Sequence, residues 1–212
     1  MKAVVIDGIT KGADVCLSEV AVPEVKPGWV LVKVKAFGVN HSEQVLREEE
    51  IAEAYIKKPL IPGIECVGEI ADASDSSFRV GQKVCALMGG MGRSFDGSYA
   101  EYALLPVHHV FAIETELSWE EAAAVPESYF TAWGSLFECL RLTKEDALLI
   151  RGASCALGLV AIQIAKAIGA TVIATTHRKK YVDELRQAGA DGVLLDEKKK
   201  LDKKTLLSVE KA

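Results

Sequence analysis

The chain has 212 residues, of which 50% are hydrophobic and 26% are charged, and its net charge at pH 7 is -5. This composition is typical of a globular chain that folds as one large domain or two small ones, and it excludes disorder as the default state. A negative chain offers no general basic field for phosphates, so we expect no nucleic-acid partner.

No apolar run approaches the ~20 residues that a bilayer-spanning helix needs. The amino end, MKAVVIDGIT, lacks the long apolar stretch of a signal peptide. We therefore expect a cytoplasmic protein with no membrane partner. The chain has five cysteines, an odd number, and no C-x-x-C pair, so we expect no disulfide framework.

Short alternating stretches dominate residues 1–117. In residues 29–36, Val30, Val32 and Val34 share one face while Lys33 and Lys35 share the other, as a half-buried strand requires. Further strands are expected at residues 2–6, 64–71, 83–87, 98–104 and 109–113. This pattern predicts a β domain, built as a barrel or a sandwich. The glycine-rich stretch at 88–97 is either a surface loop or a loop at a cleft.

The pattern changes after residue 117. Ser118 and Glu121 form a Ser-x-x-Glu capping signature for a helix that Pro126 interrupts, and residues 131–140 predict a second helical piece. Residues 147–151, 157–168, 171–176, 179–188 and 192–195 then alternate as strand, helix, strand, helix and strand. This order predicts a parallel sheet within a partial dinucleotide-binding domain over 118–196. Residues 197–212 form a charged, lysine-rich tail.

The first strand-to-helix turn of this unit is a candidate phosphate loop. It contains Gly152, Ser154, Cys155, Ala156, Leu157 and Gly158, a variant of the glycine-rich dinucleotide fingerprint in which Cys155 replaces the middle glycine. Such a turn presents backbone N–H groups and a helix N-terminus to a pyrophosphate. The cysteine side chain either narrows the approach or faces away, and a plain strand-helix turn is the structural alternative.

The next strand ends without the acidic residue that holds the ribose of NAD. Instead, hydroxyls and cations follow one another at Thr176, His177, Arg178 and Lys180. Cations suit the dianion of an adenosine 2′-phosphate, so this segment favours NADP(H) over NAD(H). The alternative is a solvated, positively charged first turn of a helix.

Four short motifs resemble the medium-chain dehydrogenase/reductase superfamily, in its zinc-free quinone-oxidoreductase-like branch. They are GVNHSE at 38–43, IPGIE at 61–65, DGSYAEY at 96–102 and TAW at 131–133. The resemblance implies a GroES-like β domain followed by a Rossmann domain, here partial because only three parallel strands precede the tail. Zinc-dependent relatives carry Cys at Asn40 and His at Ile64, and only Cys85 lies near the region of the structural-zinc cysteines, so we expect no metal.

The resemblance also implies roles for single residues. Asn40 is expected near the nicotinamide and Thr131 near the cofactor, while His41, Arg47 and Tyr55 are further candidates for the catalytic cleft. Three of these residues have a structural alternative: Asn40 caps a turn, Thr131 is an ordinary helix hydroxyl, and Arg47 belongs to a solvated charged run.

The implied reaction is hydride transfer from NADPH to a quinone, an enone or a related carbonyl compound, with orientation of the reactants as the main contribution of the fold. Half a Rossmann sheet would expose an edge, which predicts a homodimer. Two other functions stay open. The first alternative is a truncated, non-enzymatic binding or assembly protein. The second is an NADP(H)-binding redox sensor that uses Cys155.

Overall fold

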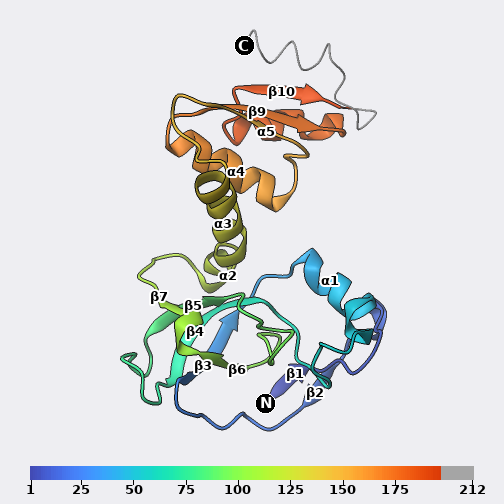
Figure 1. Ribbon diagram of the computed structural model, residues 1–212, viewed down its shortest axis with the longest axis vertical. Coiled ribbons are helices and arrows are strands. Elements are labelled where there is room, and N and C mark those ends of the chain that lie inside the picture. Colours follow the sequence, from blue (N-terminus) through green and yellow to red (C-terminus); the bar gives the residue numbers. More distant parts are fainter. Residues whose placement is uncertain (197–212) are drawn as a thin grey trace. The chain divides into compact units, whose positions relative to one another are not determined.

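The structure is a computed structural model that describes residues 1–196. The chain divides into two compact units, the first comprising Met1–Glu127 and the second beginning at Ser128. Figure 1 shows the elements in chain order. The first unit is built around an antiparallel sheet and the second around a parallel sheet, as the sequence predicted. No helix within residues 1–196 has both the length and the apolarity to cross a bilayer.

A five-stranded antiparallel sheet with the order β6-β3-β4-β5-β7 forms the centre of the first unit. Its strands are β3 (Trp29–Ala36), β4 (Glu65–Asp72), β5 (Lys83–Leu87), β6 (Tyr102–Pro106) and β7 (Val110–Ala112). Val30 and Val32 are completely buried, because the alternation along β3 directs them into the core beneath the sheet. Residues 98–101, expected to be strand, precede β6 instead.

Smaller elements surround this sheet. A two-stranded ribbon pairs β1 (Lys2–Val4) with β2 (Leu17–Glu19). Helix α1 (His41–Glu48) follows β3, and 3-10 turns occur at Gly12–Asp14, Glu50–Ala52 and Val107–His109. Helix α1 was not predicted from the sequence. Its first residue follows Asn40, whose backbone N–H donates to Glu43 Oε2 at 2.6 Å in the manner of a capping box.

Two short helices come between β7 and the parallel strands in the chain order. Helix α2 (Trp119–Ala123) begins after Ser118, which accepts from Glu121 N at 3.3 Å and donates its own N–H to Glu121 Oε2 at 2.9 Å. The predicted capping box is therefore confirmed. Helix α3 (Pro126–Trp133) begins at the proline itself, since a first-turn position needs no N–H donor. A π-helical stretch, Gly134–Cys139, continues from it.

The second unit contains a three-stranded parallel sheet with the order β10-β9-β8. Strand β8 (Ala147–Ile150) leads into α4 (Ala156–Ala167), and β9 (Thr171–Thr176) leads through a 3-10 turn into α5 (Val182–Gln187) and then β10 (Gly192–Leu195). The alternating order confirms the predicted strand and helix succession. In the register of the sheet, Leu195 lies opposite Thr176, so the carboxyl ends of β9 and β10 meet at one edge.

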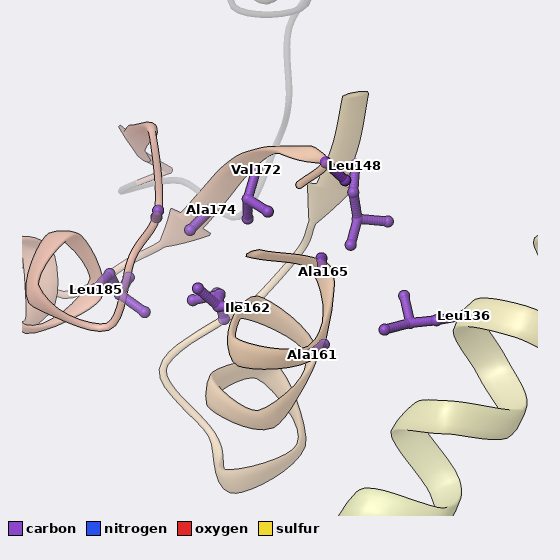
Figure 2. Packing of buried hydrophobic residues seen from close by; sticks show 11 residues of the cluster. Leu136, Leu148, Ala161, Ile162, Ala165, Val172, Ala174 and Leu185 are labelled. Carbon is purple, nitrogen blue, oxygen red and sulfur yellow. The ribbon is translucent and has the colours of Figure 1, made fainter. Parts of the chain in front are cut away.

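Packing of α4 against the parallel sheet forms the core of this unit (Figure 2). Ile162 is fully buried between Val172 of β9 and Leu185 of α5, which are also fully buried. Small residues of α4, Ala161 and Ala165, allow the helix to approach the strands closely. This packing fixes where α4 begins, and the phosphate-loop candidate lies at that beginning.

Candidate functional site

The turn between β8 and α4 is fastened to the neighbouring strand β9. Gly152 N donates to Thr175 Oγ1 at 3.1 Å, and Ala153 N donates to Thr175 O at 2.8 Å. Gly152 has a φ of +67°, and no atom lies within 4 Å of the position a Cβ would take. Glycine therefore permits the left-handed turn and leaves open space above it.

The beginning of α4 is capped by the cysteine of the fingerprint. Cys155 occupies the N-cap position, and its Sγ accepts from Gly158 N at 3.4 Å. The sulfur thus folds back over the first helical turn and takes one of the N–H groups that an anion would use. The N–H groups of Ala156 and Leu157 belong to the same first turn and have no acceptor within the helix.

Close packing of helix against turn depends on Gly158. A Cβ at this position would lie 2.5 Å from Ala153 O and 2.6 Å from Ala153 Cα, well inside contact distance. Glycine therefore brings the α4 N-terminus down onto the turn. Together with the open space at Gly152, this geometry fits a dinucleotide pyrophosphate. The N–H of Gly158 differs from the other N–H groups of this turn, because the Cys155 sulfur already accepts from it.

The hydroxyls and cations expected to select a phosphate lie together after β9. Thr176 Oγ1 accepts from Arg178 N at 3.2 Å and lies 3.4 Å from Ser154 Oγ, which links this segment to the turn. Arg178 Nε donates to His177 Nε2 at 3.1 Å. Lys180 Nζ lies 4.7 Å from the centroid of the Tyr181 ring, and the Arg178 guanidinium lies 5.9 Å from it. These cations are held near one another by an aromatic surface.

A cavity of about 170 Å³ joins the turn to this segment. Arg151, Gly152, Thr175, Thr176, His177 and Asp196 line it. Asp196 was not a predicted site residue. Its buried Oδ1 has no hydrogen-bond partner among the residues described, and its backbone N–H donates to Thr176 O at 2.8 Å. Parallel pairing of β9 and β10 is the signal that could have found it, because neighbouring strands end at the same edge.

In the first unit, Asn40 lies against two buried carboxylates. Asn40 Nδ2 donates to Glu65 Oε1 at 2.8 Å, and Asn40 N donates to Glu43 Oε2. Glu43 also accepts from Ile64 N at 2.9 Å and from Tyr99 OH at 2.7 Å. Each carboxylate residue is only 3% exposed. The amide nitrogen of Asn40 is thus committed to Glu65, and the Asn40 side chain also takes part in the capping box of α1 with Glu43.

Burial changes the titration of this cluster. Desolvation raises the pKa of Glu65, opposed by hydrogen bonds from the Asn40 side chain and the Glu127 N–H. The pKa of Tyr99 is raised as well, first by burial and then by its hydrogen bond to Glu43, so Tyr99 remains a neutral donor.

Three of the four predicted cleft residues line one cavity of about 460 Å³ in the first unit, which we call the α1 cavity. Its lining includes Asn40, His41 and Arg47 together with apolar Val4, Ile6 and Val39. Tyr55 lies outside this lining and is 68% exposed. Thr131 lies half-buried in α3 of the second unit, where its carbonyl accepts from Ser135 Oγ at 2.8 Å.

Within residues 1–196, no three His, Cys, Asp or Glu side chains gather in a way that could hold a metal ion. Asn40 and Ile64 stand at the two positions discussed for zinc, and Ile64 is buried. All five cysteines are free thiols. Burial raises the pKa of Cys66 and of Cys85, which keeps these two thiols protonated.

Two family models match the chain. Residues 26–115 match the alcohol dehydrogenase GroES-like domain, and residues 156–209 match the zinc-binding dehydrogenase model. Human quinone oxidoreductase is 34% identical over 181 residues, covering 83% of this chain and 52% of that protein. An NAD-dependent alcohol dehydrogenase of Saccharolobus solfataricus is 30% identical over 213 residues, covering 86% of this chain and 61% of that protein.

Among solved structures, an NAD-dependent alcohol dehydrogenase superposes with a TM-score of 0.85 at 28% identity, covering 93% of this chain and 64% of that chain. The chain thus spans between half and two thirds of the length of these relatives. The likeness includes both the antiparallel and the parallel sheet, and it confirms a GroES-like β domain followed by a partial Rossmann-type sheet.

Proposed function

Because this chain belongs to the medium-chain dehydrogenase/reductase superfamily, in its quinone-oxidoreductase-like branch, we propose that it is an NADPH-dependent oxidoreductase. Its acceptor is a quinone, an enone or a related small carbonyl compound, and it works without zinc. The cations that follow β9 support the choice of NADPH. Arg178 and Lys180 lie in the turn after Thr176, whose Oγ1 is 3.4 Å from Ser154 Oγ of the phosphate-loop candidate.

Each part of the second unit has a role in this proposal. The turn at Gly152 and the α4 N-terminus hold the pyrophosphate through backbone N–H groups, and Arg178 and Lys180 pair with the 2′-phosphate. NADPH, when bound, supplies the hydride. Thr131 contributes to holding the cofactor. Asp196 is the opposing feature, because a carboxylate near a ribose favours a free 2′-hydroxyl.

In the first unit, the α1 cavity receives the acceptor. Its apolar wall residues suit a ring, and His41 at the start of α1 offers a ring N–H as a hydrogen-bond donor for negative charge that develops on the acceptor oxygen. Asn40, which lines the same cavity, is held in one orientation by its hydrogen bond to Glu65. Proximity and orientation, rather than a Lewis acid, then supply the catalysis.

Ligand-dependent thermal stability tests the cofactor assignment. NADPH and 2′,5′-ADP should raise the melting temperature more than NADH and 5′-AMP at equal concentration. Arg178→Ala should reduce the shift with 2′,5′-ADP while leaving the shift with 5′-AMP nearly unchanged. Arg79→Ala, an exposed arginine of the first unit, serves as the control. A larger shift with NADH than with NADPH would reject the NADPH assignment and favour the Asp196 interpretation.

Quinone-dependent oxidation of NADPH, followed by absorbance, tests the activity itself. If the wild-type chain binds NADPH but oxidises it with no quinone or enone, the reductase proposal fails and the redox-sensor alternative gains support. Exposed Cys155 at the α4 cap is the observation behind that alternative.

We also propose a cytoplasmic homodimer. Among residues 1–196, β8 pairs with β9 alone, so one edge of the parallel sheet offers main-chain groups to another strand. Free thiols at all five cysteines support a reducing compartment. Size-exclusion chromatography with light scattering tests the dimer, and a monomeric mass at micromolar concentration would reject it.

A further inference from the structure

We propose that Arg47 is a positioning residue that fastens residues 7–15 as one wall of the α1 cavity and thereby restricts the size of the acceptor. The clamp is a property of the first unit alone. Its effect on acceptor size depends on the proposed function.

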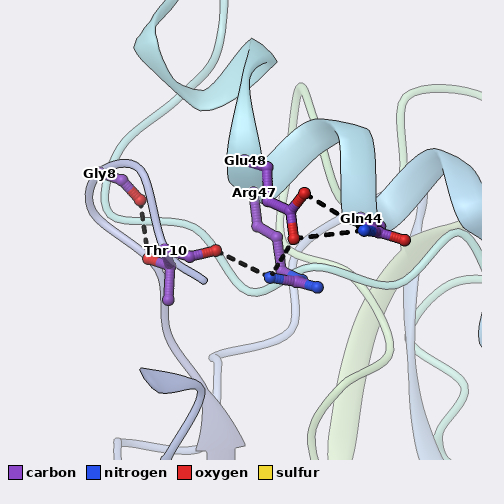
Figure 3. A network of polar contacts seen from close by, with 5 residues as sticks. All are labelled: Gly8, Thr10, Gln44, Arg47 and Glu48. Atoms are coloured by element: carbon purple, nitrogen blue, oxygen red, sulfur yellow. Dashed lines mark hydrogen bonds and ion pairs between the residues drawn. The ribbon is translucent and has the colours of Figure 1, made fainter. Parts of the chain in front are cut away.

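Two hydrogen bonds join Arg47 to a single residue of the segment, and Figure 3 shows the one that the guanidinium donates. Thr10 N donates to Arg47 O at 2.8 Å, and Arg47 Nη1 donates to Thr10 O at 2.8 Å. The Arg47 carbonyl therefore binds the N–H of Thr10, and the Arg47 guanidinium binds the carbonyl of Thr10. The second bond has a charged donor, which makes it stronger than a neutral one.

Neighbours on α1 hold the guanidinium in place. Glu48 Oε1 lies 3.1 Å from Arg47 Nη1, and Gln44 Nε2 donates to both Glu48 oxygens at 3.3 and 3.2 Å. Gln44 and Glu48 are four residues apart and so meet on one side of the helix. On the segment, Gly12 leaves room for the arginine, because a Cβ there would lie 3.3 Å from Nη2.

The segment has few other attachments. Its remaining hydrogen bonds are local: Thr10 Oγ1 donates to Gly8 O, Asp14 N to Lys11 O and Val15 N to Gly12 O. Within residues 1–196, the hydrogen bonds that link 7–15 to the rest of the first unit all go to Arg47. Most of these residues are exposed, so apolar burial contributes little to holding the segment.

The fastened segment borders the space where the acceptor would bind. Gly12 and Val15 line the α1 cavity together with Asn40 and His41 at the start of α1. With this wall in place, the cavity measures about 460 Å³, and aliphatic side chains such as Val4, Ile6 and Val39 line it together with polar ones. A space of this size and chemistry suits a flat ring compound with one polar end. Release of the wall would admit larger acceptors and hold small ones less well.

Hydrogen exchange measured by mass spectrometry tests the clamp without any activity. In Arg47→Ala, amides of the 7–15 peptide should exchange at least about tenfold faster than in the wild type, because a charge-assisted bond is lost. Thr10→Ala is the matched control, since both clamp bonds use the main chain of Thr10, and its exchange should stay within about twofold of the wild type. Arg47→Lys keeps the positive charge but lacks the planar guanidinium, so the exchange rate of the 7–15 peptide should lie between those of the wild type and Arg47→Ala.

The proposal is overturned if 7–15 stays as protected in both Arg47 variants as in the wild type while the melting temperature shows folded protein. If Arg47→Ala does not fold, Arg47→Lys decides the same question.

Steady-state kinetics with 1,4-benzoquinone and 9,10-phenanthrenequinone tests the effect on acceptor size. In Arg47→Ala, KM for the small quinone should rise about tenfold with kcat changed less than twofold, while KM for the three-ring quinone should fall. Equal changes for both quinones, or a loss confined to kcat, would overturn the size limit. An inactive wild type would reject the proposed function, and the exchange experiment would still decide the clamp.

Discussion

Asn40 Nδ2 donates to Glu65 Oε1 at 2.8 Å, joining the residue before α1 to the first residue of β4. The other oxygen, Glu65 Oε2, accepts from Glu127 N at 2.8 Å, near the start of α3. Gly38 makes room for this carboxylate, because a Cβ there would overlap Glu65 Oε1. One buried acidic side chain thus ties together three segments that are far apart in the sequence.

Glu65→Gln should destabilise the first unit by about 1–3 kcal/mol, because the amide NH2 would face a donor where a carboxylate oxygen now accepts. Urea denaturation followed by tryptophan fluorescence measures the change. Glu114→Gln, at an exposed glutamate, should leave stability within about 0.5 kcal/mol of the wild type. Equal stability of the Glu65 variant and the wild type would show that the carboxylate is dispensable.

The same residue predicts a pH dependence. Its raised pKa means that the folded state holds the proton more tightly than the unfolded state, where a glutamate titrates near about 4.3. The contribution of Glu65 to stability should therefore fall as pH rises from about 4.3 through the folded-state pKa. The wild-type free energy of unfolding minus that of Glu65→Gln, measured from pH 4 to 8, isolates this effect. A difference that increases with pH would contradict it.

Local patterns were sufficient to predict most of the architecture. Alternation identified the strand at 29–36, and Ser118 with Glu121 identified the start of α2. Helix α1 was not predicted, and Arg47, a cleft candidate with a solvated charged run as its alternative, bonds instead from α1 to Thr10. The second helical piece was predicted to begin at residue 131, but α3 begins at Pro126, since proline suits a first helical turn.

Long-range partners explain what the sequence could not reveal about the site. Glu43 meets Tyr99 and Glu65 meets Glu127, at separations of 56 and 62 residues, so no local periodicity encodes them. Asp196 meets the β9 edge through strand pairing, and Cys155 bonds to its own helix rather than simply narrowing the turn.

Ile162→Ala should destabilise the second unit by about 2–5 kcal/mol, whereas Ile162→Val should cost about 0.5–1.5 kcal/mol. Ile162 packs in the cluster with Val172 and Leu185, and truncation would leave a cavity beneath the sheet (Figure 2). Chemical denaturation of both variants measures the graded loss. Leu140→Ala, at a leucine that is 62% exposed, is the control and should change little.

Asp191→Asn should remove part of the acid sensitivity of the second unit. Lys166 Nζ lies 2.9 and 2.8 Å from the Asp191 oxygens, and Val172 N donates to Oδ2 at 2.7 Å. The lysine first and the backbone N–H second lower the pKa of this carboxyl. Its stabilisation is therefore present above the unfolded value of about 3.9 and is lost as pH falls through the folded-state pKa.

Melting temperatures of Asp191→Asn and the wild type between pH 2 and 6 should converge at the acid end. Asp183→Asn, at an exposed aspartate, should run parallel to the wild type over the same range. Curves that stay equally far apart at every pH would exclude the ion pair as the source of the difference.

Gly158→Ala and Gly134→Ala should change stability in opposite directions. At Gly158 a Cβ meets the Ala153 backbone at 2.5 Å, so the α4 N-terminus must move away from the turn, at a cost of about 1–3 kcal/mol. At Gly134, in a helical stretch, nothing lies within 4 Å, so alanine should stabilise by about 0.5–1 kcal/mol. Because the moved helix also misaligns its N–H groups, Gly158→Ala should abolish the thermal shift with 2′,5′-ADP, while Gly134→Ala should retain it. A Gly158 variant that keeps both wild-type stability and the thermal shift would show that close approach of α4 to the turn is not needed for binding.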